Sequence, residues 1–240
     1  MRPGGSLLEI GEAEWYGDVP AQELLQDIKA HGTRDAFEAA VGLIGQARAG
    51  EATVSAWGLA KLMYEALLGI GRVDSIDLHG SDAAHRVDLN YASALPDAMY
   101  DIVYNCGTAE HVFHIGRVLE FIHDATGLGG LMVHCFPLSG LLDHGFWTVN
   151  PVMVFCLARA NLYGLLDIAV SQIGGRFMRL DPATARVELR TMAREGRLPE
   201  NSWLHVVWRK ASDADFAIPT QEIYTACPDP EVVEAWRAMR

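Results

Sequence analysis

The residues best suited to do chemistry lie in one short stretch, residues 105–111. In it, Glu110 and His111 follow a run of small and polar residues. An imidazole titrates near neutral pH, so His111 could accept a proton from a substrate hydroxyl group. Glu110 could contact that substrate, or it could be an acid that a helix dipole stabilises at a helix N-terminus. Cys106 is not expected to be a nucleophile, because no strand–turn–helix elbow surrounds it.

A second group of candidates lies downstream, in residues 143–147. It combines a histidine, His144, with two aromatic residues, Phe146 and Trp147. His144 is a second candidate base. The aromatic side chains could stack on a planar acceptor, or they could anchor the loop in the core. The sequence does not separate these two interpretations.

Two of the histidines also have the spacing of a metal-ligand pair. His111 and His114 are three residues apart, so a helix would place both on one face. A third ligand could only be guessed, and the candidates are His123, Asp124, His134 and His144. The sequence therefore predicts no bound metal.

Acidic residues stand at the ends of three earlier strand-like segments. The first segment closes with Glu9-Ile10-Gly11-Glu12, the second with Asp77-Leu78 and the third with Asp88-Leu89. In open α/β sheets, ligands bind outside the carboxyl ends of the strands, and an acid there can accept hydrogen bonds from ribose hydroxyls. Taken singly, each acid is weak evidence, because Asp is also common in turns.

The hydrophobic pattern predicts alternating strands and helices that would position these residues. Apolar, β-prone runs predict strands at residues 7–10, 73–78, 86–90, 102–104, 131–136, 165–173 and 203–208. Helical periodicity predicts helices at about 23–31, 35–48, 55–68, 112–122, 150–163 and 229–240. Asn150 before Pro151 marks one helix start, and the glycines at 127, 129 and 130 are expected to end the helix before them. This order is typical of a mostly parallel α/β sheet with antiparallel strands at its edge.

The order of strands and acids resembles that of the class I S-adenosylmethionine-dependent methyltransferases over most of residues 7–210. The resemblance is carried by Glu9-Ile10-Gly11-Glu12-Ala13, Asp77, Asp88-Leu89, the Asp101–His111 segment and Gly129-Gly130-Leu131. It implies a Rossmann-like, seven-stranded, mostly parallel sheet with an antiparallel edge strand. It also implies S-adenosyl-L-methionine as the cofactor and methyl transfer to an oxygen or nitrogen atom of a small molecule.

The resemblance implies a role for each candidate residue. In that family, the first loop meets the methionine part of the cofactor, the second acid holds the ribose and the third acid meets the adenine. The cofactor-binding residues would be Glu9, Gly11, Glu12, Asp77, Leu78, Asp88, Leu89, Asn105, Cys106 and Gly107. The acceptor would lie against Glu110, Phe146 and Trp147, with His111 or His144 as the base.

Two features depart from the family pattern. Only Ala13 stands near the usual second glycine of the first loop, and the chain between Gly11 and Asp77 is far longer than one crossover helix needs. Residues 16–52 are therefore interpreted as inserted helices that could form a lid. The departures leave open a binding or regulatory module without catalytic activity. A nicotinamide-dependent enzyme is disfavoured, because no complete Gly-x-Gly-x-x-Gly follows the first strand.

Composition narrows the class of protein further. Half of the 240 residues are hydrophobic, and the formal net charge is -12. We expect no nucleic-acid surface, because that would need clustered basic residues. The arginines between residues 176 and 197 are interpreted as a solvated face, although they could serve an acidic substrate. No apolar run is long enough to span a bilayer, and four scattered cysteines indicate neither disulfides nor zinc. We expect one cytoplasmic domain over residues 1–240, with a homodimer permitted.

Overall fold

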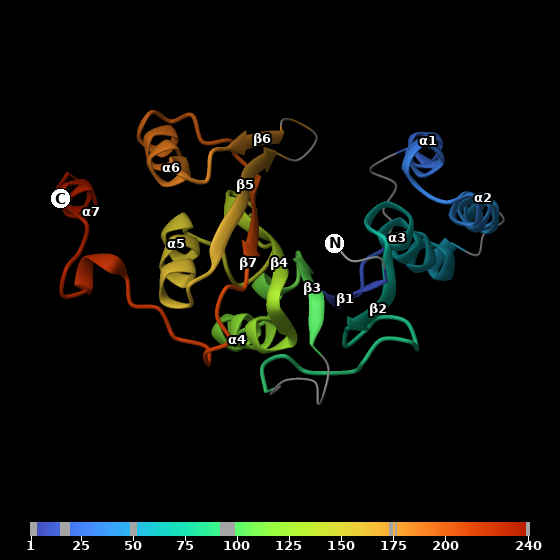
Figure 1. The fold of residues 1–240 in the computed structure, drawn as a ribbon. Coiled ribbons are helices and arrows are strands. Elements are labelled where there is room, and N and C mark those ends of the chain that lie inside the picture. Colours follow the sequence, from blue (N-terminus) through green and yellow to red (C-terminus); the bar gives the residue numbers. More distant parts are fainter. Residues whose placement is uncertain are drawn as a thin grey trace.

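A mixed, seven-stranded sheet forms the centre of the protein, with helices beside it (Figure 1). The computed structural model describes residues 4–14, 20–48, 52–91, 99–172, 175 and 177–238. The strands are β1 (Gly5–Ile10), β2 (Ile70–Ile76), β3 (Tyr100–Cys106), β4 (Thr126–Ser139), β5 (Gly164–Gln172), β6 (Phe177–Leu180) and β7 (Ser202–Arg209). The helices are α1 (Ala21–His31), α2 (Arg34–Arg48), α3 (Ala52–Leu68), α4 (Ile115–Ala125), α5 (Pro151–Ala160), α6 (Ala185–Arg194) and α7 (Pro230–Arg237). Two 3₁₀ turns, η1 (Ala109–His111) and η2 (Glu222–Tyr224), complete the elements.

The strands lie in the order β2-β1-β3-β4-β7-β5-β6. The first four are mutually parallel, whereas β7 is antiparallel to both β4 and β5, and β6 is antiparallel to β5. The predicted α/β class is therefore confirmed. The late strands expected to form an antiparallel edge, residues 165–173 and 203–208, are β5 and β7, which pair antiparallel to each other; the edge strand itself is β6, which the sequence did not predict. Alternate residues of β7 are buried and half-buried, so one face of the strand lies in the core and the other is partly exposed.

Residues 86–90 do not form the predicted third strand. The chain makes only an isolated bridge between Ile76 and His85 beyond the β2 edge. Side chains hold the rest as a loop: Arg86 donates to the carbonyls of Leu78 and Gly80, and Asp88 accepts from the Asn90 backbone N–H. Such local hydrogen bonds compete with strand pairing, so the short apolar pattern of these residues does not produce a strand.

Two predicted helix ends are displaced, and two elements lacked a clear signal. Helix α4 ends at Ala125, before the glycines, because Thr126 caps it with a hydrogen bond to Ile122 O and begins β4 at once. Gly127, Gly129 and Gly130 therefore lie within β4. Helix α5 starts as predicted, with Asn150 Oδ1 accepting from Val152 N, but it ends at Ala160. Strand β6 and helix α6 lie within the segment in which the sequence showed only scattered arginines.

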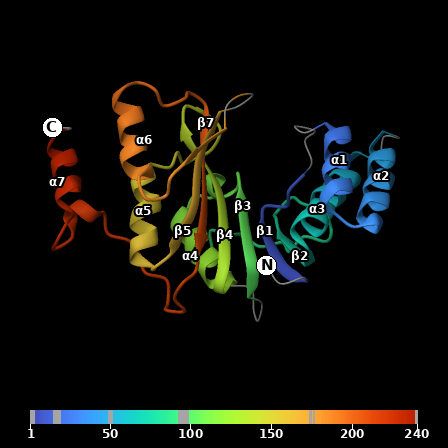
Figure 2. The ribbon, with the colours of Figure 1, turned by 45° about the horizontal axis from the view of Figure 1, so that its top comes forward.

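The three helices between β1 and β2 have a core of their own. It is made by the buried side chains of Leu24, Ile28, Ala40, Ile44, Leu59 and Leu62. Helices α1 and α2 pack on α3, which in turn contacts β2. Figures 1 and 2 show these helices beyond the β2 edge, whereas α5 and α6 lie on the other side, near β5 and β7. Their lid role stays a prediction, and residues 16–19 and 49–51 of the expected insertion lie outside the described residues.

The main core lies between the sheet and helices α4, α5 and α6. Its fully buried side chains include Trp208, Phe136 and Ile122. Within the described residues, no helix combines the length and the apolar character needed to cross a lipid bilayer.

Candidate functional site

The loops after β1 and β3 meet at the carboxyl edge of the sheet. The chain leaves β1 toward β2 on one side and comes back through β3 on the other, so the strand order reverses between β1 and β3. This reversal is where open α/β sheets form ligand crevices. Gly11 has a φ of 81°, and a Cβ added to it would lie 2.0 Å from Thr108 Oγ1. Only glycine fits this close approach of the two loops.

Asp77 follows β2 at the same edge and is held in one orientation. Its Oδ2 accepts from Glu12 N at 2.9 Å, and its Oδ1 accepts from His79 N at 2.6 Å. A carboxylate offers about four acceptor positions, so two remain for a ligand. The side chain is half-buried, and Leu78 next to it is exposed. The half-exposed carboxylate can therefore still accept hydrogen bonds from hydroxyl groups.

Glu12 has a different role from the one predicted. Its buried carboxylate pairs with Lys61 of α3 and accepts from both the backbone N–H and the hydroxyl of Ser81. Burial opposes its ionisation, but these hydrogen bonds outweigh burial and lower the pKa of Glu12. The carboxylate therefore ties the β1 loop to α3 and to the β2 loop.

Three further predicted cofactor residues are also turned inward or held locally. Glu9 is fully buried, and its Oε2 accepts from the Ser75 hydroxyl at 2.5 Å. Leu89 packs in the main core, and Asp88 binds Asn90 in the loop described above. Because residues 86–90 form no strand, Asp88 does not follow a strand of the sheet.

The end of β3 is fixed by a buried asparagine. Asn105 Oδ1 accepts from Ala109 N at 3.0 Å, which sets the turn into η1. Gly107 in that turn has a φ of 80°. Cys106 lies beside Cys135 of β4, and its interaction with the Cys135 side chain lowers the pKa of Cys106.

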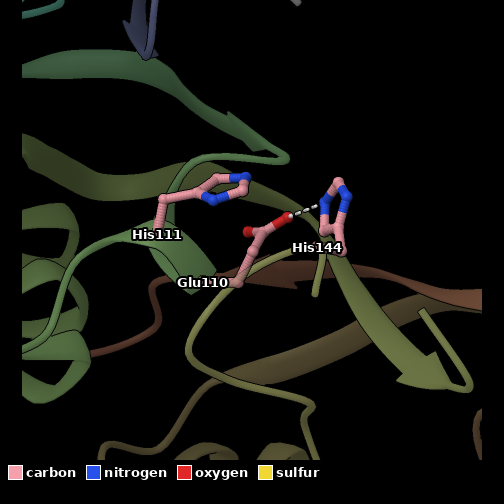
Figure 3. Close-up of side chains that lie close together, drawn as sticks. All are labelled: Glu110, His111 and His144. Carbon is pink, nitrogen blue, oxygen red and sulfur yellow. Dashed lines mark hydrogen bonds and ion pairs between the residues drawn. The ribbon is translucent and has the colours of Figure 1, made fainter. Parts of the chain in front are cut away.

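Glu110, His111 and His144 lie together above this turn (Figure 3). Glu110 is fully buried, and its Oε1 lies 3.4 Å from His144 Nε2. The two imidazole rings have centroids 4.9 Å apart, and both side chains reach solvent. Burial raises the pKa of Glu110 above its usual range, and the two histidines offset only part of that rise. The two candidate bases, which the sequence identified separately, thus form one pair around one carboxylate.

The loop that carries His144 is clamped against η1. Phe146 N donates to Glu110 O at 2.8 Å, and the Trp203 ring lies edge-on to His144 at 4.9 Å. Leu141 and Asp143 have φ values of 54° and 63°. Side chains with a Cβ rarely adopt this left-handed region, which costs of order 1–3 kcal/mol per residue. The fold therefore holds His144 in place at an energetic cost.

An aromatic patch, made of Phe113, Phe146 and Trp147, adjoins the histidine pair. The Phe113 ring centroid lies 5.9 Å from that of Phe146 and 6.4 Å from that of Trp147. Trp147 Nε1 donates to Val112 O, while Phe113 and Phe146 are 60% and 66% exposed. These exposures favour a substrate surface over a core anchor. The sequence did not indicate Phe113 as a site residue, because an apolar residue beside a helix start is typical of a core position.

The other candidate metal ligands lie apart from this group. His114 packs edge-on against Phe113, His123 binds Tyr163, and His134 stacks on Phe136 inside the core. Among the residues that the structure describes, the group that could hold a cation is instead Glu110, His111 and His144, whose ligand atoms all lie within 4.8 Å of one another.

A cavity of about 680 Å³ lies elsewhere, between α5, α6 and α7. It is lined by none of the residues predicted for the site, all of which the structure describes. Arg186, Arg190 and Arg194 line it, and Arg186 pairs with Glu222. Part of the arginine run, which was interpreted as a solvated face, therefore faces this cavity. Arg176 of that run lies outside the described residues.

No protein-family model and no curated protein matches the sequence. Solved structures do resemble the chain. The N-methyltransferase NodS from Bradyrhizobium japonicum, in complex with S-adenosyl-L-homocysteine, is 11% identical, with 87% of this chain and 79% of that chain covered at a TM-score of 0.45. An S-adenosylmethionine-dependent methyltransferase from Mesorhizobium loti is 15% identical, with 87% of this chain and 93% of that chain covered at a TM-score of 0.43. The [4+2]-cyclase SpnF is 16% identical, with 86% of this chain and 75% of that chain covered at a TM-score of 0.42. At such low sequence identities and TM-scores, the activities of those proteins do not transfer to this chain.

Proposed function

We propose that the protein transfers a methyl group from S-adenosyl-L-methionine to an oxygen or nitrogen atom of a small-molecule acceptor. The observation that carries the proposal is the pairing of His111 and His144 beside an exposed aromatic patch, at the sheet edge that also bears Gly11 and Asp77. That edge holds groups suited to a nucleoside ligand next to groups suited to a planar acceptor.

The described residues fit the cofactor at two points. Asp77 is oriented by two backbone N–H groups and keeps acceptor positions for ribose hydroxyls. Gly11 and Gly107, both with positive φ, let the backbone of their loops approach a ligand closely. When bound, the cofactor would supply an electrophilic methyl group on a sulfonium. The adenine contact assigned to Asp88 has no such support, since that residue stands in an irregular loop.

The histidine pair would accept the proton of the acceptor. A neutral imidazole of His111 or His144 can take a proton from a hydroxyl or amine as the methyl group is transferred. The carboxylate of Glu110 beside His144 would then stabilise the imidazolium that forms. The aromatic patch would hold the acceptor ring in line with the methyl group, and this alignment would supply most of the rate enhancement.

A second candidate is a binding or regulatory module without catalytic activity. The contacts of Glu12 favour it, because its side chain fills part of the space between the β1 and β2 loops. A Cβ added to Gly80 would lie only 2.7 Å from Glu12 Oε2. In either case we propose a cytoplasmic location, since all four cysteines are free thiols.

Binding of S-adenosyl-L-homocysteine separates the two candidates. At about 100 times its dissociation constant, a ligand adds roughly 2.7 kcal/mol to the stability of the folded state. We expect this ligand to raise the melting temperature of the wild type. Asp77→Ala should remove the shift, whereas Asp82→Ala, in an exposed position of the same loop, should keep it. No shift of the wild type at millimolar ligand would refute the enzyme and leave the module.

A further inference from the structure

The carboxylate of Glu110 is poorly satisfied for a buried charged group. The side chain is fully buried, and its Oε2 has no hydrogen-bond partner within the described residues. Its Oε1 has only His144 Nε2, at 3.4 Å, which is long for a hydrogen bond to a charged group. Burying a carboxylate with so few partners is costly unless the group takes up a proton or a positive charge lies beside it.

The positions of the three side chains suit a metal ion. Two donors bound to one tetrahedral ion at about 2.0–2.1 Å lie about 3.3–3.4 Å apart, which matches the Glu110–His144 separation. All three ligand atoms lie within 4.8 Å of one another. Donors on one ion lie closer together than 4.8 Å, so the exposed His111 side chain would move toward the other two ligands when a metal binds. Figure 3 shows the carboxylate between the two imidazole rings.

We propose that Glu110, His111 and His144 bind one divalent transition-metal ion of the zinc class. Two imidazoles and one carboxylate form a three-ligand set that leaves a coordination position open. The ion would neutralise the buried carboxylate and give its unpartnered oxygen a ligand. The open position would face the side on which His111 and His144 reach solvent, next to the aromatic patch.

The surrounding loops already hold two of the ligands in place. Phe146 N donates to Glu110 O, and the Trp203 ring packs against His144. Such supporting contacts reduce the ordering needed when a metal binds. The sequence predicted no metal because a third ligand for the His111–His114 pair could only be guessed, whereas the fold brings His144, one of the guessed ligands, to His111.

The inference does not depend on methyl transfer, and it replaces the base role, because a histidine nitrogen bound to the ion cannot also accept the proton of an acceptor. Metal binding can be measured on the protein alone, without cofactor or acceptor. A protein that binds zinc but not S-adenosyl-L-homocysteine would retain this site and refute the proposed function. The reverse result would retain the function and refute the metal site, leaving the histidines as bases.

The test is a titration of the tag-free, chelator-treated protein with Zn²⁺, followed by calorimetry and equilibrium dialysis. We expect one equivalent to bind with a micromolar or lower dissociation constant. His111→Ala and His144→Ala should each weaken binding by at least ~100-fold, since changes outside the ligand shell alone cost about 10–100-fold. Glu110→Gln should also weaken binding and should leave the metal-free protein folded, because it replaces a buried charge with a neutral group of the same shape.

Two control variants locate the site. His114→Ala removes a nearby histidine outside the group, and Cys106→Ser removes a nearby thiol; both should bind zinc as the wild type does. Titration with Co²⁺ should give an absorption spectrum without a thiolate charge-transfer band. The inference is wrong if the wild type binds no zinc at micromolar concentration, if both histidine variants still bind, or if a control variant loses binding.

Discussion

Gly11 is the residue at which backbone conformation and site geometry are most tightly linked. We predict that Gly11→Ala destabilises the protein by at least ~1 kcal/mol, because it adds both left-handed strain and a contact with Thr108. Gly129→Ala is the matched control, since Gly129 has nearly the same φ and no atom within 4 Å of its added Cβ. Urea unfolding of both variants measures the difference. Equal losses would show that the contact between the two loops contributes nothing.

Glu9 provides a prediction for pH dependence. Burial raises its pKa above the usual 4.5, so folding favours the protonated form. The stability from this group is fully present below pH 4.5 and is lost as pH rises through the folded-state pKa. Glu9→Gln mimics the protonated form. The melting temperature of this variant minus that of the wild type should therefore increase as pH rises from 4 to 8. A difference between the two proteins that stays constant over this range would contradict the assignment.

The residues of the candidate site show what sequence alone can predict. His111, His144, Phe146 and Trp147 were found because polar and aromatic residues follow strand-like runs. Their mutual contacts could not be predicted, because His144 comes from a loop whose path depends on its hydrogen bond to Glu110 and on Trp203 of β7. Similarly, nothing in the sequence distinguishes the buried, ion-paired Glu12 from an acid that is free to bind a ligand.

Among the elements, helix α5 has the clearest local start. Asn150 Oδ1 accepts from Val152 N at 3.1 Å, and Pro151 occupies the first turn. We predict that Asn150→Ala costs about 1 kcal/mol of stability, the usual value of an N-cap. Asn150→Asp should keep most of this stability, because Asp caps equally well and its negative charge interacts favourably with the helix N-terminus. Chemical denaturation compares the three proteins, and equal losses in both variants would exclude a capping role.

Elements with strong local patterns were predicted well, and the exceptions have physical causes. Strands β1, β3, β4, β5 and β7 follow apolar runs that tertiary packing merely extends. Residues 86–90 have a similar run, but side-chain hydrogen bonds from Arg86 and Asp88 hold them in a loop. The place of β7 between β4 and β5 could not be predicted, because strand order depends on connections that periodicity does not encode.

On the scale of the whole molecule, the three N-terminal helices form a second packing centre. Ile28 is fully buried among α1, α2 and α3, whereas Ile122 of α4 is buried against the sheet. Each isoleucine-to-alanine change should cost about 2–5 kcal/mol of local stability. We predict that Ile28→Ala accelerates hydrogen exchange in α1 and α2 more than in β3 and β4, and that Ile122→Ala accelerates it in β3 and β4. Uniform acceleration in both variants would show that the helices and the sheet unfold as one unit.

The most direct test of the proposed function is a crystal structure of the protein grown with S-adenosyl-L-homocysteine. We predict density for the ligand at the carboxyl ends of β1, β2 and β3, with its ribose hydroxyls on Asp77 and its sulfur facing His111 and His144. Density confined to the cavity between α5, α6 and α7, or crystals that contain no ligand at saturating concentration, would contradict the proposal that this edge of the sheet is a methyl-transfer site.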